Sequence, residues 1–231
     1  MDPLGFDDVL ARARDRVSER QRVAAERVAT SVEASSSTYV ARWPGRMRRA
    51  LASTPPPACD AGQVRALWDG ERVVDVLTVV RAEDLDRAEP AYAEQAEEWV
   101  ERLRGAVRYH DRWAVESALA RPLAPPETEY VVVATSYRMP RMEVGTGGFA
   151  TPGALGIVEG PGFAPGSLSG RFHVVAGDRT VCATDVAAVS SETVTHWSFG
   201  GPSSYAADQR RVTRDLLKNV VRAAYDRWSS P

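Results

Sequence analysis

The three histidines, His110, His173 and His196, are the residues best suited to acid–base chemistry near neutral pH. Their spacing matches neither His-x-x-x-His nor His-Glu-x-x-His, so no metal site is predicted. His173 and His196 lie in segments with strand-like sequence, and Asp185 lies between them. If those strands are neighbours, His173, Asp185 and His196 form a candidate site for a hydrolase or lyase.

Two glycine-containing stretches resemble known motifs but lack the setting that those motifs need. Residues 145–150 read Gly-Thr-Gly-Gly-Phe-Ala, the dinucleotide-binding string, yet Thr-Pro-Gly follows where a helix has to begin. Residues 166–170 read Gly-Ser-Leu-Ser-Gly, whose centre is Leu168 and not the serine of a nucleophile elbow. No cofactor is therefore predicted, and catalysis is the less favoured class of function.

The two cysteines, Cys59 and Cys182, indicate either one disulfide or two buried thiols. The first alternative requires an oxidising compartment, and the second is typical of the cytoplasm. The sequence does not choose between them. A disulfide closing so long a loop would stabilise the fold by about 4 to 5 kcal/mol on the chain-entropy model.

One basic and aromatic cluster is a candidate binding surface. The candidate binding residues are Trp43, Arg46, Arg48 and Arg49, together with Phe149 and Phe163 in the Gly-rich segment. The alternative is that the cluster faces the stretch from Asp69 to Arg104, where eleven acids and five Arg give a net charge of −6. We favour this complementarity over nucleic-acid binding, because the cluster is short and has no companion patch.

Composition agrees with a folded chain that has no general affinity for nucleic acid. The 231 residues include 29 Lys plus Arg against 31 Asp plus Glu, a formal charge of −2, and 44% of them are hydrophobic. A chain of this size can bury a substantial core. Its balanced charge argues against a nucleic-acid partner. No apolar stretch approaches the roughly 20 residues of a transmembrane segment.

The N-terminal part is expected to be helical. Apolar residues recur at helical spacing over residues 6–33, which predicts one long helix that packs on its own domain, on a partner protein or on a second copy. The serine-rich residues 33–38 indicate a break. The run Thr54-Pro-Pro-Pro is a stiff connector, and it suggests a boundary between a helical arm at 1–53 and a domain at 58–231.

The rest of the chain reads as strands and helices in irregular order. Strands are predicted at 72–80, 129–137, 168–176, 179–188 and 193–199, and helices at 90–119 and 204–228. Residues 145–170 form a Gly-rich loop. Because strands and helices do not alternate, we expect an α+β fold, with an antiparallel sheet packed by two long helices.

The cellular location is left open by the first residues. The start, Met-Asp-Pro-Leu-Gly, lacks the features of a signal peptide, which predicts a cytoplasmic protein as written. If Met1 replaces an export signal, the protein is periplasmic or anchored in the envelope. Residues 172–182, followed by 190–194, resemble in general terms bacterial envelope proteins in which a strand–turn–strand with a Cys precedes a final helix.

The leading hypothesis is a non-catalytic binding or scaffold protein, located in the bacterial cell envelope if it is exported. Its partner contacts are expected at the N-terminal helix and the Gly-rich loop, because long loops on a rigid sheet are common binding sites. The partner is a protein or a second copy held through residues 6–33. The runner-up is the hydrolase or lyase with its site near His173.

Overall fold

The computed structural model describes residues 16–52, 56, 58–60, 73–143, 162–190 and 202–229. The chain forms two compact units. The helical unit comprises residues 1–46 and 89–127, and the sheet unit comprises residues 47–88 and 128–231. Residues 89–127, which the predicted domain 58–231 includes, therefore belong to the helical unit.

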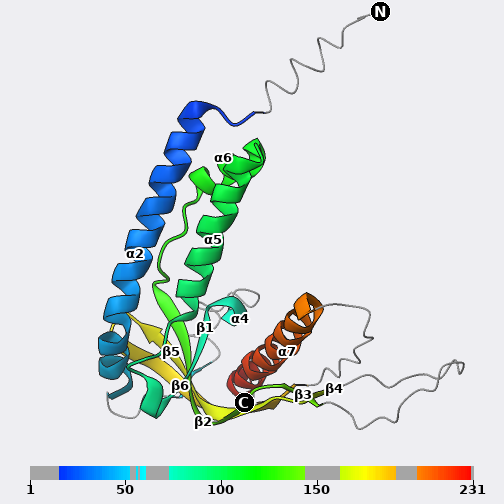
Figure 1. The fold of residues 1–231 in the computed structure, drawn as a ribbon. Coiled ribbons are helices and arrows are strands. Elements are labelled where there is room, and N and C mark those ends of the chain that lie inside the picture. The colour runs from blue at the N-terminus through cyan, green and yellow to red at the C-terminus, as the bar shows by residue number, and fades with distance from the viewer. Residues whose placement is uncertain are drawn as a thin grey trace, which may run out of the picture. The chain divides into compact units, whose positions relative to one another are not determined.

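The helical unit is built from α2 (Glu19–Ala52) up to Arg46, α5 (Ala91–Arg108) and α6 (Arg112–Ala120). Figure 1 shows α2 and α5 side by side. Small and medium apolar residues fill the seam, namely Ala25, Ala29 and Val32 of α2, Tyr92, Ala96, Val100 and Leu103 of α5, and Val115 of α6. Alanines let two helix backbones approach closely, so the thin apolar stripe of α2 suffices for packing.

One guanidinium group also links these two helices. Arg104 of α5 lies 2.9 Å from a carboxylate oxygen of Glu26 and 2.7 Å from one of Glu33, both on α2. These ion pairs raise the pKa of Arg104 through hydrogen bonds to both carboxylates. Because all three side chains remain partly exposed, the pairs align the helices more than they stabilise them.

Helix α2 is continuous through the serine-rich residues 33–38, where the sequence indicates a break. The Thr38 hydroxyl donates to the Ala34 carbonyl one turn earlier, so it bonds within the helix rather than ending it. Pro44 also lies inside the helix. Trp43, Met47 and Ala50 are fully buried around it. Burial of this turn therefore outweighs the unfavourable local sequence.

The predicted helix over 90–119 is divided at residues 109–111. His110 has φ 58°, in the left-handed region, which ends α5. The Asp111 carboxylate then accepts a hydrogen bond from the backbone N–H of Ala114 (3.0 Å) and caps the start of α6. Gly105 lies within α5 and does not interrupt it.

The sheet unit contains a four-stranded mixed sheet in the order β1-β2-β5-β6. Its strands are β1 (Leu77–Arg81), β2 (Thr128–Arg138), β5 (Ser167–Ala176) and β6 (Arg179–Val189). The other described elements of the unit are α4 (Val73–Val76), η1 (Ala82–Asp84), α7 (Pro202–Ser229) and a separate pair of short strands, β3 (Arg141–Glu143) and β4 (Gly162–Ala164). The predicted α+β class is confirmed.

The sheet differs from the expected antiparallel one in a single pairing. β1 and β2 are parallel, whereas β2–β5 and β5–β6 are antiparallel. A parallel pair requires a long connection between its strands. Residues 82–127 supply that connection and carry α5 and α6 with it. The second long helix that we expected on the sheet is therefore part of the helical unit.

Helix α7 packs on one face of the sheet and forms the core with it. Phe172 of β5 lies at the centre, with its ring 5.4 Å from that of Trp228 and 6.1 Å from that of Tyr130, measured between centroids. The other residues of this core include Val132, Val174, Cys182, Leu216, Val220 and Ala224. The predicted helix over 204–228 thus has its apolar stripe buried as expected.

Glycine at position 170 is required by the close approach of β2. A Cβ atom there would meet the Val133 carbonyl oxygen at 2.3 Å and the Ala134 Cα at 2.8 Å. The register between the two strands shifts immediately after Ala134. The missing side chain therefore makes room for the β-bulge that bends β2 before it ends.

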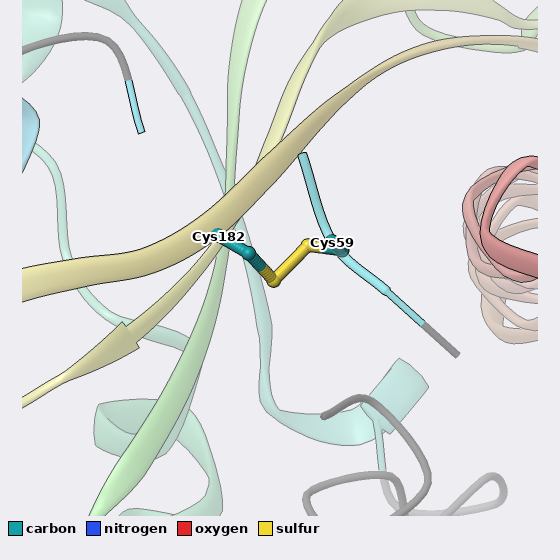
Figure 2. Close-up of a disulfide and its surroundings, with 2 residues drawn as sticks. All are labelled: Cys59 and Cys182. Carbon is teal, nitrogen blue, oxygen red and sulfur yellow. A yellow bond between two sulfur atoms is a disulfide. The ribbon is translucent and has the colours of Figure 1, made fainter. Parts of the chain in front are cut away.

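The two cysteines form a disulfide, so the first of the two sequence alternatives is confirmed. Figure 2 shows Cys59 on a short segment beside β6, which carries Cys182. The neighbouring residues Ala58 and Ala183 form an isolated parallel bridge. Both sulfur-bearing residues are buried in the core beneath α7. The disulfide thus ties an otherwise weakly paired segment to the sheet.

Removing this disulfide should lower the stability of the sheet unit. The two cysteines are separated by 123 residues, and a loop of this size corresponds to about 4 to 5 kcal/mol of chain entropy. We expect a Cys59→Ser, Cys182→Ser variant to lose this amount in urea unfolding of the full chain. Adding reductant should weaken the unmodified protein equally and leave the double variant unchanged; equal stability of both proteins without reductant would contradict the prediction.

Candidate functional site

His173, the first of the predicted catalytic residues, is a buried residue of β5. It pairs with Val131 of β2 on one side and Ala183 of β6 on the other, and 7% of it is exposed. Its Nδ1 atom has no hydrogen-bond partner within the described part of the chain. Burial lowers the pKa of His173 to about 4, with a smaller contribution from the positive charge of Arg171. The ring is therefore neutral near pH 7.

Asp185 lies on the same face of the sheet as His173, two residues along β6 from Ala183, which pairs with His173. It is directly opposite Arg171 in the strand register, and the Arg171 Nε atom lies 4.0 Å from an Asp185 carboxylate oxygen. The negative charge of Asp185 offsets part of the lowering of the His173 pKa. His196 lies outside the described residues. The structure therefore brings two of the three candidates onto one face, with the aspartate exposed and the histidine buried.

The basic cluster at the end of α2 is used mainly in contacts within the protein. Arg46 lies over the ring of Tyr39, 4.7 Å from its centroid. Arg48 forms an ion pair with Asp86, and Arg49 lies 3.9 Å from Asp178. The pair between Arg48 and Asp86 agrees with the expectation that this cluster faces the acidic stretch 69–104.

The remaining candidate binding residues are placed as follows. Trp43 is fully buried, so it is not exposed for contact with a partner. Phe163 lies in β4, whose backbone pairs with β3. Phe149 lies outside the described residues. A binding role for Phe149, Phe163 and the arginines stays a prediction.

A pocket that the sequence did not predict lies at the carboxyl ends of β1 and β2. We call it the Arg pocket; its volume is about 790 Å³. The pocket is lined by residues from both strand ends, from the turns after β1 and from α7: Val79, Val80, Arg81, Asp84, Arg87, Ala88, Tyr137, Arg138, Met139, Pro140 and Gln209. All of them belong to the sheet unit. The carboxyl ends of neighbouring parallel strands are frequent ligand sites in sheets that have helices on their faces.

Three guanidinium groups and one carboxylate give the Arg pocket its charge. Arg81, Arg87 and Arg138 are exposed side chains, as is Asp84. Tyr137 is half-buried beside them, and burial raises the pKa of its hydroxyl. The hydroxyl is therefore protonated at neutral pH and can donate a hydrogen bond. This combination suits recognition of an oxyanion rather than proton transfer.

This pocket was missed in the sequence analysis because the net charge of the stretch 69–104 is negative and conceals the two pocket arginines within it. Arg81 and Arg87 lie inside the stretch 69–104, which is acidic as a whole. Their spacing around Asp84, with two residues between each pair, was a local signal. It becomes meaningful only when the fold brings Arg138 of a distant strand to the same place.

Two aromatic side chains are exposed in the helical unit. The exposed fraction is 79% for Tyr109, at the end of α5, and 82% for Trp113, in the first turn of α6. The φ of His110 and the cap at Asp111 turn the chain between them, so that α6 buries Val115 rather than Trp113. Exposed aromatic residues are enriched at protein–protein interfaces.

Comparison with protein-family models, curated proteins and solved structures found no match to this chain. Within the described residues, no group of His, Cys, Asp and Glu is arranged to hold a metal ion. In the same ranges, no helix combines the length and the apolar character that crossing a bilayer needs. The functional argument therefore rests on the residues described above.

The buried His173 predicts an acid-dependent loss of stability. The pKa is about 4 in the folded state against the ordinary 6.5, so the unfolded chain binds a proton that the folded chain excludes. Above pH 6.5 His173 is neutral in both states, and the free energy of unfolding is at its full value. As the pH falls toward 4, the unfolded chain gains a proton at His173 and the free energy of unfolding decreases. The free energy of unfolding should drop by about 3 kcal/mol between pH 7 and pH 4 through this group.

The test is to compare urea unfolding of the unmodified protein with that of a His173→Phe variant at both pH values. The variant should lack this part of the pH dependence, because its ring does not titrate. His110→Asn is the matched control, since it removes an exposed histidine and keeps a residue tolerant of positive φ. Equal pH dependence in all three proteins would contradict the assignment.

Proposed function

We propose that this protein is a non-catalytic binding or scaffold protein of the bacterial cell envelope. It contacts a protein partner through the helical unit that contains α2, and through the Gly-rich loop 145–170. The observation that carries the proposal is the exposure of Tyr109 and Trp113, four residues apart in the sequence, at the α5–α6 junction.

The size of these two side chains supports a role in binding. A tyrosine and a tryptophan each bury 150 to 250 Å² when they are covered, at about 25 cal/mol per Å² for the apolar part. Leaving both in water forgoes this stabilisation. The short α6 holds Trp113 in an ordered first turn, capped by Asp111, so little conformational entropy has to be lost on binding.

The disulfide supports the envelope as the location. Structural disulfides persist in oxidising compartments, such as the bacterial periplasm, and are rare in the cytoplasm. Both cysteines of the chain take part in one disulfide, and both are buried. An exported protein whose short segment 58–60 is tied to the sheet by this bond is consistent with that pattern.

The alternative function, a hydrolase or lyase, draws less support from the geometry. A general base must reach the proton that it abstracts. His173 is buried between two strands, and neither His173 nor Asp185 lines the Arg pocket. Binding is therefore the better supported proposal.

A site-specific crosslinking experiment tests the binding proposal. A benzophenone-bearing phenylalanine placed at position 113 of the full chain in its source cells should capture the partner on illumination. We expect one discrete product of higher mass, because the residue would lie inside the interface. A product of twice the mass of the chain would indicate self-association, and any other discrete mass a different protein.

The same crosslinker at position 94 is the matched control, because Glu94 is exposed on α5 of the same unit. It should give no discrete product. If position 113 also gives none, or if both positions give the same smear of products, the helical unit is not the contact surface and the proposal is wrong.

The location has a separate test in the state of the two thiols. Free thiols are blocked in intact source cells, and the mass of the purified protein is then measured before and after reduction. No blocked cysteine before reduction, and two free thiols after it, is the expected result for an oxidising compartment. Two blocked cysteines before reduction would contradict the envelope location and leave the binding proposal to the crosslinking result.

A further inference from the structure

We propose that the Arg pocket binds a phosphate monoester that carries an apolar substituent. This inference concerns a second surface, in the sheet unit, and goes beyond the partner contact assigned to the helical unit. It depends on the charges, shape and lining of the pocket, and not on where the protein resides.

The arginines of the pocket differ in their pairing from several other arginines of the sheet unit. Some guanidinium groups elsewhere in the unit face carboxylates, as in the pairs Arg48–Asp86 and Arg49–Asp178 and in Arg214–Asp75 at 2.9 Å. Arg81, Arg87 and Arg138 have no such ion pair among the described residues. Three guanidinium groups against one carboxylate around one cavity favour an anion as its occupant.

The balance of charge indicates a dianion. Three arginines against Asp84 leave the lining with an excess of two positive charges. A phosphate monoester carries about −1.5 to −2 at pH 7, because its second pKa is about 6. It also offers three acceptor oxygens, which guanidinium groups and the protonated Tyr137 hydroxyl can bind together. A single carboxylate supplies half this charge and fewer acceptors.

The rest of the lining indicates an apolar substituent on that phosphate. Val79 of β1 is partly buried, and Pro140 after β2 is buried. Met139 also lines the pocket and is 47% exposed. A cavity of about 790 Å³ is much larger than a phosphate ion alone requires. An alkyl or aryl group attached to the phosphate would cover these side chains.

The pocket chemistry is shared by two sources of ligand, a soluble phosphate monoester and the headgroup of an anionic lipid. Hexyl phosphate, below its micelle concentration, is the soluble probe. Hexanol lacks its charge, and inorganic phosphate lacks its apolar part. Vesicles of phosphatidylcholine with and without phosphatidic acid test the lipid source, because phosphatidic acid also ends in a phosphate monoester.

Titration calorimetry of the full chain with hexyl phosphate should show one site per chain. Inorganic phosphate should bind more weakly, hexanol should not bind measurably, and raising the salt concentration should weaken the binding of hexyl phosphate. Vesicle binding that requires phosphatidic acid would assign the source as a lipid, and its absence would assign a soluble ligand.

Single substitutions decide whether the arginines of the pocket are responsible. Arg138→Gln and Arg81→Gln should each raise the Kd for hexyl phosphate about tenfold or more, because each removes a charge-assisted hydrogen bond. Asp84→Asn should lower the Kd several-fold, because it removes a like charge from beside the phosphate. Arg179→Gln is the matched control: Arg179 is an exposed arginine at the start of β6 that lies outside the pocket, and its loss should leave the Kd unchanged.

Three results would overturn the proposal. The first is no measurable binding of hexyl phosphate to the folded protein. The second is equal binding of hexanol. The third is a Kd that changes as much in Arg179→Gln as in Arg138→Gln, which would mean a general attraction of anions to the surface. Circular dichroism and urea unfolding establish that each variant is folded before its Kd is compared.

Discussion

The burial of one sheet face beneath α7 is the interaction on which the sheet unit depends. Phe172 lies at its centre, between the rings of Tyr130 and Trp228, so that β2, β5 and α7 meet in one aromatic cluster. The disulfide between Cys59 and Cys182 lies in the same core. A buried core without voids transmits strain, so the positions of these strands are fixed together.

This constraint also positions the Arg pocket. The register of β2 is set by its pairing with β1 on one side and β5 on the other. The absence of a side chain at Gly170 allows β2 to bend near Ala134, just before Tyr137 and Arg138 reach the pocket. The charged side chains of the pocket come from the ends of β1 and β2 and from the turns after β1, and they are thus held by strands whose core under α7 is apolar. Loops held on a rigid sheet are common places for binding.

Local patterns in the sequence predicted most of the elements, because their signals extend over only a few residues. The predicted strands at 168–176 and 179–188 and the predicted helix at 204–228 agree with β5, β6 and α7 to within two residues at each end. Gly177, with φ +62°, lies in the turn between β5 and β6. The elements that differ from the prediction are determined by tertiary packing. Burial around Trp43 carried α2 through a stretch that reads as a break, and one turn of helix, α4, replaced the first half of the strand expected at 72–80.

The candidate sites were less predictable, since they depend on residues that are far apart in the sequence. The alternation of β5 placed His173 on the face opposite Phe172, but it did not show that this second face is also buried. Arg138 is more than 50 residues from Arg87, and only the parallel pairing of β1 with β2 brings them to one cavity. No local pattern contains that information.

The interrupted order of the sheet unit has a consequence for how the chain reaches this structure. β1 pairs with β2, which begins only after residues 82–127. Cys59 forms its disulfide with Cys182, which is 123 residues later in the sequence. Contacts of such sequence separation slow folding, because a long loop has to close before they form. The helical unit, whose segment 89–127 is continuous, can form while β1 still has an unpaired edge. During synthesis, the sheet is therefore the last part to be completed, and an oxidant that acts early meets Cys59 without its partner.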